Sequence, residues 1–333
     1  MRHRKIRQQS NYRKKSSPSS SHPSLQQPTD TMSKPSILSC GEVLWDLFPE
    51  GARFGGAPAN FACHAAILGG QVSMLSAVGK DAKGDEALSI LQGFDIDTSL
   101  MQRIKDAPTG TVSVRLDILG KPTFEIHSGS AWDRIAGTNE LESRVAVANA
   151  IYFGTLGQRS ELSRATIQKA IQIAKLHGVL RVLDVNLRKP FYDAALIRES
   201  IEHASVLKLS DDELVEVAAA CDVAFDTEPE PMLRQLLYRF KLDLVVMTRG
   251  AQGAILVSAA ESVIQPGVPT VVRDTVGAGD SFTAALVIGL LRGDKLNDIA
   301  RTACQIAAAV CALEGAVPIA VDCRQENGDK RMI

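Results

Sequence analysis

The sequence predicts an α/β protein in which helices cover both faces of a mostly parallel β-sheet, with a smaller β-sheet beside it. Two observations carry this prediction. Short apolar runs alternate with segments of helical period over most of the 333 residues, and helical crossovers of this kind join parallel strands. Residues 111–127 break the rhythm, because apolar and polar residues alternate around Gly120-Lys121 as in an antiparallel hairpin.

The main sheet is expected to be built from buried strands that are each followed by a helix. The first strand is the apolar run SILSCG, and a small-residue helix follows Gly55-Gly56. Later strands are short runs rich in Val, Ile, Leu and Phe, and ligands are expected at their carboxyl ends. The expected strands are 36–41, 72–78, 150–153, 180–184, 205–209 and 244–248. The expected helices are 58–68, 85–92, 160–177, 211–220, 231–240, 280–292 and 296–313.

The hairpin of residues 111–119 and 122–127 is expected to join residues 43–53 in the smaller sheet, which projects from the main domain. A sheet of this kind exposes one apolar face, which a second copy of the chain could cover. A homodimer through this sheet is therefore a further prediction.

Residues 1–34 are expected to be a disordered tail. They hold eight Lys or Arg and one acid, and continue into the Ser- and Pro-rich stretch SSPSSSHPSLQQPTD without an apolar period. The Arg- and Ser-rich composition is typical of a transit peptide, whereas a start at Met32, just before the first strand, is the interpretation that we favour. The whole chain has a net charge of −1, so the rest is acidic, which argues against a nucleic-acid partner.

The cysteines and histidines indicate neither a disulfide framework nor a zinc site. The six cysteines include no C-x-x-C pair and the six histidines no H-x-x-x-H pair, so a reduced, cytoplasmic location is expected. The longest apolar helical run, residues 281–291, is too short to cross a membrane.

The most informative stretch is RDTVGAGDSFTAALVIGLL, residues 273–291. Gly277 and Gly279 can adopt φ > 0 and let a ligand approach the backbone, and the helix that follows favours an anion at its N-terminus. Asp280 would repel a phosphate there unless it has another task, and accepting a proton from an attacking hydroxyl fits. A simple helix cap is the alternative for this residue.

The segment DTVGAGDSF, followed by its apolar helix, resembles the signature of the PfkB (ribokinase-like) sugar kinases, and the whole chain is most like the bacterial fructokinases of that family. The resemblance implies a ribokinase-like three-layer α/β/α sandwich over residues 35–322, with a C-terminal tail at 323–333. It also implies a lid over the sugar from about 43–57 and 108–128. It assigns an anion hole to Gly277, Ala278 and Gly279 and the catalytic base to Asp280.

A second resembling segment, GEVLWDLFPEGARFGGAPANFA at residues 41–62, is similar to the sugar-binding region of the family. A carboxylate and an amide can pair with sugar hydroxyls, so the resemblance implies that Asp46, Gly55, Gly56 and Asn60 bind substrate. Asp46 as a solvated turn residue and Asn60 as a helix cap are the alternatives.

Two further segments follow predicted strands. DVNLR, residues 184–188, resembles a segment of fructokinases and ketosugar-acid kinases, in which Arg188 would hold phosphate or an acidic substrate; a surface salt bridge is the alternative. TRGAQG, residues 248–253, resembles the family's turn beside the nucleotide and implies that Thr248, Gly250 and Gly253 bind ATP.

Metal binding is implied by resemblance alone. KLSDDE, residues 208–213, is similar to the N-x-x-E motif, so Glu213 is expected to organise Mg²⁺ through water, although Ser210 replaces the usual Asn and a capping box would also explain the pair. Asp274, with Gly315, is a candidate for binding a monovalent cation, which would be K⁺.

These resemblances imply an ATP-dependent kinase that transfers the γ-phosphate to a sugar hydroxyl. Fructose is the first choice, and ribose and 2-keto-3-deoxygluconate are the alternatives. A non-catalytic regulator that binds a nucleotide or sugar is the rival of another class. A Rossmann dinucleotide binder would need G-x-G-x-x-G after the first strand, and residues 36–60 lack it.

Overall fold

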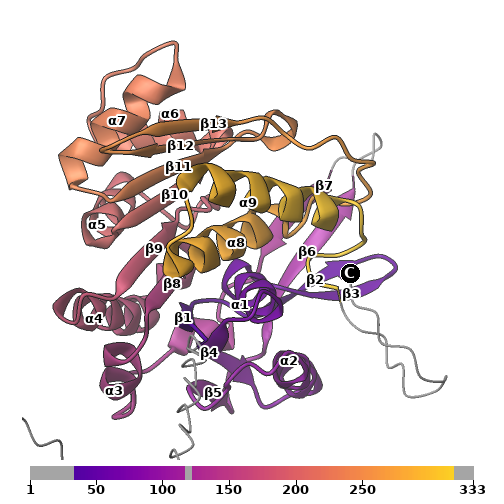
Figure 1. Ribbon diagram of the computed structural model, residues 1–333. Coiled ribbons are helices and arrows are strands. Elements are labelled where there is room, and N and C mark those ends of the chain that lie inside the picture. The colour runs from indigo at the N-terminus through magenta and orange to yellow at the C-terminus, as the bar shows by residue number, and fades with distance from the viewer. Residues whose placement is uncertain (1–33, 117–121, 319–333) are drawn as a thin grey trace, which may run out of the picture. The chain divides into compact units, whose positions relative to one another are not determined.

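The computed structural model describes residues 34–116 and 122–318, and within them a nine-stranded sheet forms the middle of the fold (Figure 1). The strand order is β13-β12-β11-β10-β9-β8-β1-β4-β5, with parallel pairing from β11 to β5 and antiparallel pairing of β12 and β13. The strands are β1 (Ser36–Cys40), β4 (Gln71–Gly79), β5 (Met101–Ile104), β8 (Ala150–Gly154), β9 (Leu180–Asp184), β10 (Val206–Ser210), β11 (Leu244–Thr248), β12 (Ala254–Ser258) and β13 (Ser262–Gln265). The predicted mostly parallel sheet is confirmed.

Both faces of this sheet are buried, which explains why its strands are apolar without alternation. Successive residues point to opposite faces, so Ile37 of β1 belongs to one hydrophobic core and Leu38 to the other. Each core is closed by its own layer of helices.

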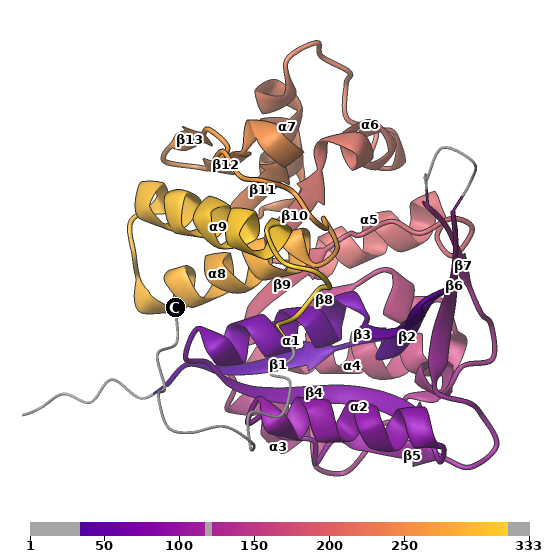
Figure 2. The same ribbon diagram turned by 90° about the vertical axis from the view of Figure 1, so that its right-hand side faces the viewer.

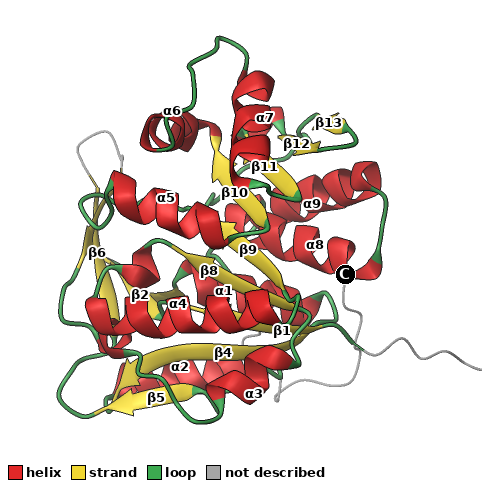
Figure 3. Ribbon diagram, turned by 90° about the vertical axis from the view of Figure 1, so that its left-hand side faces the viewer, coloured by secondary structure: helices red, strands yellow, loops and turns green. Residues whose placement is uncertain are grey.

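One layer contains α1 (Ala57–Ile67), α2 (Ala82–Gly93), α8 (Ala278–Arg292) and α9 (Leu296–Cys311). The other contains α3 (Leu141–Ala146), α4 (Glu161–Leu176), α5 (Ala194–His203), α6 (Asp211–Ala220) and α7 (Pro229–Phe240). In Figure 2, α1, α8 and α9 lie in front of the sheet, and in Figure 3, which shows the opposite side, α4 and α5 lie in front of it. Helix α8 is almost wholly buried, because its apolar residues surround it instead of forming one stripe.

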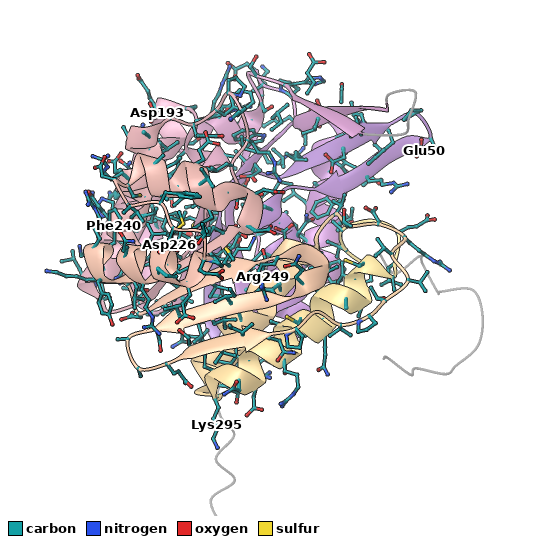
Figure 4. All side chains as sticks on the ribbon, turned by 90° about the horizontal axis from the view of Figure 1, so that it is seen from above. Glu50, Asp193, Asp226, Phe240, Arg249 and Lys295 are labelled. Atoms are coloured by element: carbon teal, nitrogen blue, oxygen red, sulfur yellow. The ribbon has the colours of Figure 1, made fainter. Side chains whose placement is uncertain are left out.

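The smaller sheet has the order β3-β2-β6-β7 and stands at the edge of the sandwich. Its strands are β2 (Leu44–Phe48), β3 (Gly51–Gly55), β6 (Gly110–Leu116) and β7 (Pro122–Ile126). The hairpin of β6 and β7 is antiparallel as predicted, and β2 joins it by parallel pairing with β6. In Figure 4, Glu50 marks the turn between β2 and β3, on the side of the view opposite Phe240 at the end of α7. We call this sheet the lid.

Several elements were not expected from the sequence. They are β5, α3, α5, the β12–β13 hairpin and three short 3₁₀ helices at Ala131–Arg134, Leu156–Gln158 and Gly250–Gln252. Most are four to six residues long, too short for a periodic pattern. The predicted tails, except Lys34, and the turn Gly120-Lys121 lie outside the described residues. Within the described ranges, no helix has both the length and the apolar character needed to cross a membrane.

Candidate active site

The glycine turn lies at the N-terminus of α8, where the sequence places it. Gly277 caps the helix with φ 80°, and the helix begins at Ala278. A β-carbon at Gly277 would lie 2.5 Å from the carbonyl oxygen of Ala316, so only glycine fits. Gly279 does not share this conformation: it belongs to the first turn of the helix, which corrects the expectation that both glycines adopt positive φ.

Three backbone amides at this turn are available to an anion. In the described part of the chain, the N–H groups of Gly277, Gly279 and Asp280 have no acceptor, whereas the N–H of Ala278 donates to the carbonyl oxygen of Thr275 at 3.3 Å. The first N–H groups of a helix are normally unpaired within it and point toward its positive end. The structure therefore supports an anion hole that includes the amide of Asp280 and leaves that of Ala278 partly occupied.

Asp280 is the third residue of α8 and is not its cap. The Nδ2 amide of Asn60, from α1, donates to Oδ2 of Asp280 at 2.8 Å. Removal from water raises the pKa of Asp280, against the lowering effects of this hydrogen bond and of the Lys208 charge. A carboxylate with a raised pKa is the stronger proton acceptor near neutral pH, so the site suits a general base.

Two cavities meet at this turn. The first, which we call the lid cavity, measures about 510 Å³ and extends from the lid to Asp280. The second, the helix cavity, measures about 580 Å³ and lies between α8, α9 and the loops after β11 and β13. Thr275 and Gly279 line both cavities. A group bound at the free amides would therefore stand at the boundary between two ligands.

The lid cavity is lined by many charged and amide side chains, and it collects most of the residues predicted to bind a sugar. Its lining includes Glu42, Asp46, Gly56, Asn60, Asn186, Arg188, Lys208 and Asp280. Gly56 has φ 103°, and a β-carbon there would lie 2.6 Å from the backbone oxygen of Glu42. Gly55 does not line the cavity; a β-carbon there would lie 2.8 Å from Oδ2 of Asp46, so this glycine leaves space for that carboxylate.

Arg188 is the only cation among the predicted site residues, and in the described ranges its side chain has no acidic partner. Within the described ranges its guanidinium donates only to the carbonyl oxygen of Leu187, at 3.0 Å, and no carboxylate lies within 4.0 Å of it. Burial raises the pKa values of Glu42, Asp46 and Asp280, and the positive charge of Arg188 opposes that rise. The alternative of a surface salt bridge finds no support here, and the guanidinium can serve a ligand.

The helix cavity contains the residues predicted to lie beside the nucleotide. Thr248, Gly250 and Gly253 line it, together with apolar residues of α8 and α9 such as Phe282 and Ala307. Gly253 has φ 88°, and a β-carbon there would lie 2.1 Å from the backbone oxygen of Gln265. An apolar cavity next to amides at a helix N-terminus matches the two halves of a nucleotide, its base and its phosphates.

Glu213 and Ser210 form the capping box that the sequence offered as one account. The carboxylate of Glu213 accepts hydrogen bonds from the N–H of Ser210 at 2.8 Å and from the N–H of Leu187 at 2.7 Å. The second bond joins α6 to the DVNLR segment. Glu213 thus positions the loop that carries Arg188, whatever further role it has.

Two further residues of the candidate site escaped the sequence analysis. Lys208, of β10, is 6% exposed and its Nζ lies 3.1 Å from the carboxylate of Asp184. A β-carbon on Gly279 would lie 3.2 Å from that Nζ, so the ammonium group stands beside the anion hole. Burial opposes the charge of Lys208, but Asp184 and the other nearby acids raise its pKa, and it remains a cation. Lysine within an apolar strand carries no sequence signal, because its role depends on the neighbouring strand.

Glu42 is the second. It lies between β1 and β2, is 3% exposed, and its Oε2 has no hydrogen-bond partner in the described ranges. Burial raises the pKa of Glu42 to about 7, and the charge of Asp280 adds to this. Burial likewise raises the pKa of Asp46 to about 6. The lid cavity therefore holds three carboxylates, those of Glu42, Asp46 and Asp280, and for each of them burial disfavours the charged form.

Replacing Glu42 by glutamine should stabilise the protein at alkaline pH. The folded protein holds the Glu42 proton up to a pKa of about 7, against an ordinary value of 4.5, so the stability that this group contributes is complete below about pH 4.5 and is lost as the pH rises to about 7. At pH 8, the free energy of unfolding of Glu42→Gln should exceed that of the wild type by about 3 kcal/mol. Urea unfolding at pH 5 and pH 8 measures this. The exposed Glu86→Gln is the control, and equal differences at both pH values would contradict the argument.

A lidded cavity lined by carboxylates, an apolar cavity beside it, and a carboxylate with free amides at their boundary form the arrangement expected of a kinase for small hydroxyl compounds. The model of the pfkB family of carbohydrate kinases matches residues 50–322, and the chain belongs to this family. It is therefore a carbohydrate kinase with the ribokinase-like fold, as the sequence predicted.

Fructokinases are prominent among similar proteins. The fructokinase of Salmonella typhimurium is 29% identical over 269 residues, which cover 78% of this chain and 85% of that protein. The crystal structure of the Vibrio cholerae O395 fructokinase in its fructose, ADP and calcium ion bound form superposes with a TM-score of 0.73 and 25% identity, covering 86% of this chain and 95% of that chain. An uncharacterized sugar kinase from Pyrococcus horikoshii in complex with ATP gives a TM-score of 0.71 and 28% identity, covering 84% and 93% of the two chains.

Proposed function

We propose that this protein is a fructokinase that transfers the γ-phosphate of ATP to a hydroxyl of fructose. One observation carries the proposal: Asp280 lines the lid cavity, while the amides beside it lie where the lid and helix cavities meet. The similarity to fructokinases supports fructose as the sugar. ATP as the donor is supported by the apolar lining and glycine turns of the helix cavity.

In the proposed reaction, the sugar lies in the lid cavity with its attacking hydroxyl toward Asp280. Asp280 accepts the hydroxyl proton while Asn60 holds the carboxylate in place through its hydrogen bond. The free amides of α8 and the Lys208 ammonium take up the negative charge of the transferred phosphoryl group. The lid excludes water, which would otherwise compete with the sugar as acceptor.

Magnesium fits this site as an ion that arrives with the nucleotide. Mg²⁺ in kinases is held by one or two carboxylates together with phosphates and water. In the described part of the chain, no group of three His, Cys, Asp or Glu side chains could hold a metal by itself. Glu213 would orient the water shell of the ion. The ion supplies positive charge to the phosphates during transfer.

A second substrate, 2-keto-3-deoxygluconate, is favoured by one specific observation. Arg188 lines the lid cavity without a carboxylate within 4.0 Å, so it can pair with the carboxylate of a sugar acid. Fructose has no carboxylate, so with fructose bound Arg188 would be available to bind a phosphate group. The proposed lid-mediated homodimer and the cytoplasmic location stay predictions.

ADP release with Mg-ATP and a panel of fructose, ribose, 2-keto-3-deoxygluconate, glucose and adenosine tests the proposal. Fructose should give the highest kcat/KM, and Arg188→Gln should then affect the neutral sugars less than the acid. A preference for 2-keto-3-deoxygluconate that Arg188→Gln removes would assign the protein to sugar acids instead. A folded protein that binds ATP but turns over no member of the panel would favour the regulatory alternative.

A further inference from the structure

Asp274, just before the glycine turn, uses its carboxylate to join three segments of the chain. Its Oδ1 accepts from the N–H of Val276 at 3.0 Å, and its Oδ2 accepts from the N–H of Gly315, in the loop after α9, also at 3.0 Å. Nη1 of Arg53, from the lid strand β3, lies 3.3 Å from the same Oδ2. The side chain of Asp274 is 17% exposed, so these bonds form in a largely closed environment.

While Arg53 occupies it, the surroundings of Asp274 do not match a monovalent-cation site. K⁺ would need several oxygen ligands, and hard cations of this kind are held by carboxylate, carbonyl and water oxygens. Here the carboxylate faces two backbone N–H groups and a guanidinium, which all carry positive partial or full charge. The charge that a cation would bring is already present as Arg53.

Arg53 is itself held in position from the lid. Its guanidinium lies 4.5 Å from the centre of the Phe48 ring, and it faces Glu50 at 3.7 Å. In the β2–β3 ladder Arg53 is the direct partner of Asp46, which lines the lid cavity. The ion pair with Asp274, 221 residues away in sequence, therefore connects the strand pair that bears Asp46 to the turn that bears Asp280.

We propose that Arg53 is a positioning residue that takes the place of a monovalent cation at Asp274 and ties the lid to the phosphate-binding turn, so that the kinase works without K⁺. This inference rests on the proposed function for its kinetic consequences, but its structural part stands independently. Because the positive charge comes from the lid, the turn reaches its active geometry only when the lid is correctly positioned. Turnover then depends on the position of the lid and not on the concentration of K⁺.

The kinetic test compares KCl with choline chloride, each at about 0.1 M so that screening is equal. Wild-type kcat/KM for the best sugar should agree within about twofold in the two salts. Arg53→Gln keeps hydrogen-bond donors without the charge, and should lower kcat/KM about tenfold in choline, with a several-fold recovery in KCl. Arg53→Lys, which keeps the charge, should lose less. Activation of the wild type about tenfold by K⁺, or an Arg53→Gln variant with wild-type kinetics or without recovery in KCl, would overturn the proposal.

A readout without substrate separates this inference from the proposed function. In hydrogen exchange, Arg53→Gln and Asp274→Asn should each accelerate the amides of residues 44–55 and 273–277 together, and the double variant should be no faster than Asp274→Asn alone. The control is Arg103→Gln, which removes an ion pair between Arg103 and Asp85 at 2.6 Å. The side chain of Arg103 is 36% exposed, which is close to the 34% of Arg53. If no sugar is turned over but both segments respond together, the proposed function fails and the tie between lid and turn holds. Unchanged exchange in 273–277 would overturn that tie.

Discussion

Asp280→Asn should leave a folded protein with at least about 100-fold lower kcat, the loss expected when a general base is removed. Asparagine has almost the same shape, and its carbonyl oxygen can still accept the 2.8 Å hydrogen bond from Asn60. The amide cannot accept a proton from the sugar hydroxyl. KM for ATP should change little, because the free amides of the turn are retained. Steady-state ADP release measures both constants.

The pH dependence gives this variant a second, independent check. Desolvation raises the pKa of Asp280, so wild-type kcat should fall as the pH falls through that raised pKa, where the carboxylate gains a proton. The residual activity of Asp280→Asn should lack this fall. Thermal unfolding should show no loss of stability, since a carboxylate that is costly to desolvate has been removed. A kcat within about tenfold of the wild type would end the assignment of Asp280 as the base.

Gly277→Ala should abolish most activity and destabilise the protein by about 2–4 kcal/mol. Two costs add: an alanine in the left-handed region at φ 80°, and a β-carbon 2.5 Å from the oxygen and 2.8 Å from the β-carbon of Ala316. Relief of the contact must move the turn, and displacement of the amides by about 1 Å would cost about 100-fold in rate. Urea unfolding and ADP release measure the two effects.

Gly293→Ala is the matched control for that variant. Gly293 caps the other end of the same helix with φ 74°, yet a β-carbon there meets nothing within 4 Å. It should cost about 1 kcal/mol and leave kcat unchanged, because only the backbone strain is shared. Equal stability losses in both variants would show that the contact with Ala316 is unimportant. Wild-type kcat in Gly277→Ala would contradict the anion hole.

The fold was largely predictable because its signals are local. Apolar strands and amphipathic or buried helices repeat with periods that a single sequence displays, and the lid hairpin shows the period of two. The β12–β13 hairpin was missed although its strands are apolar, because AILVS is separated from SVIQ by only three residues and shows no helix signal between them. Helix α5 was missed because its apolar face is short and follows the loop that carries Arg188.

In the site, too, the features that are encoded locally were predictable and the others were not. The turn of residues 277–280 was recognisable, because its glycines, acid and apolar helix are contiguous. Its details were not: positive φ belongs to Gly277 alone, and the free amide at the end of the turn is that of Asp280, not Ala278. Asn60 was expected to bind sugar, and the structure adds a direct hydrogen bond to Asp280, the proposed base.

The sequence by itself therefore determined the fold class and the family, and it predicted Asp280 as the base, since each depends on residues that are close together in the chain. Only the tertiary structure decided what lies around that base. Asn60 and Asp280 are 220 residues apart, and Arg53 and Asp274 are 221 apart. Lys208 lies beside the anion hole because β10 ends next to β9 at the carboxyl edge of the sheet. Contacts of this kind depend on which strands and loops the packing brings together, and no local period of the sequence encodes that choice.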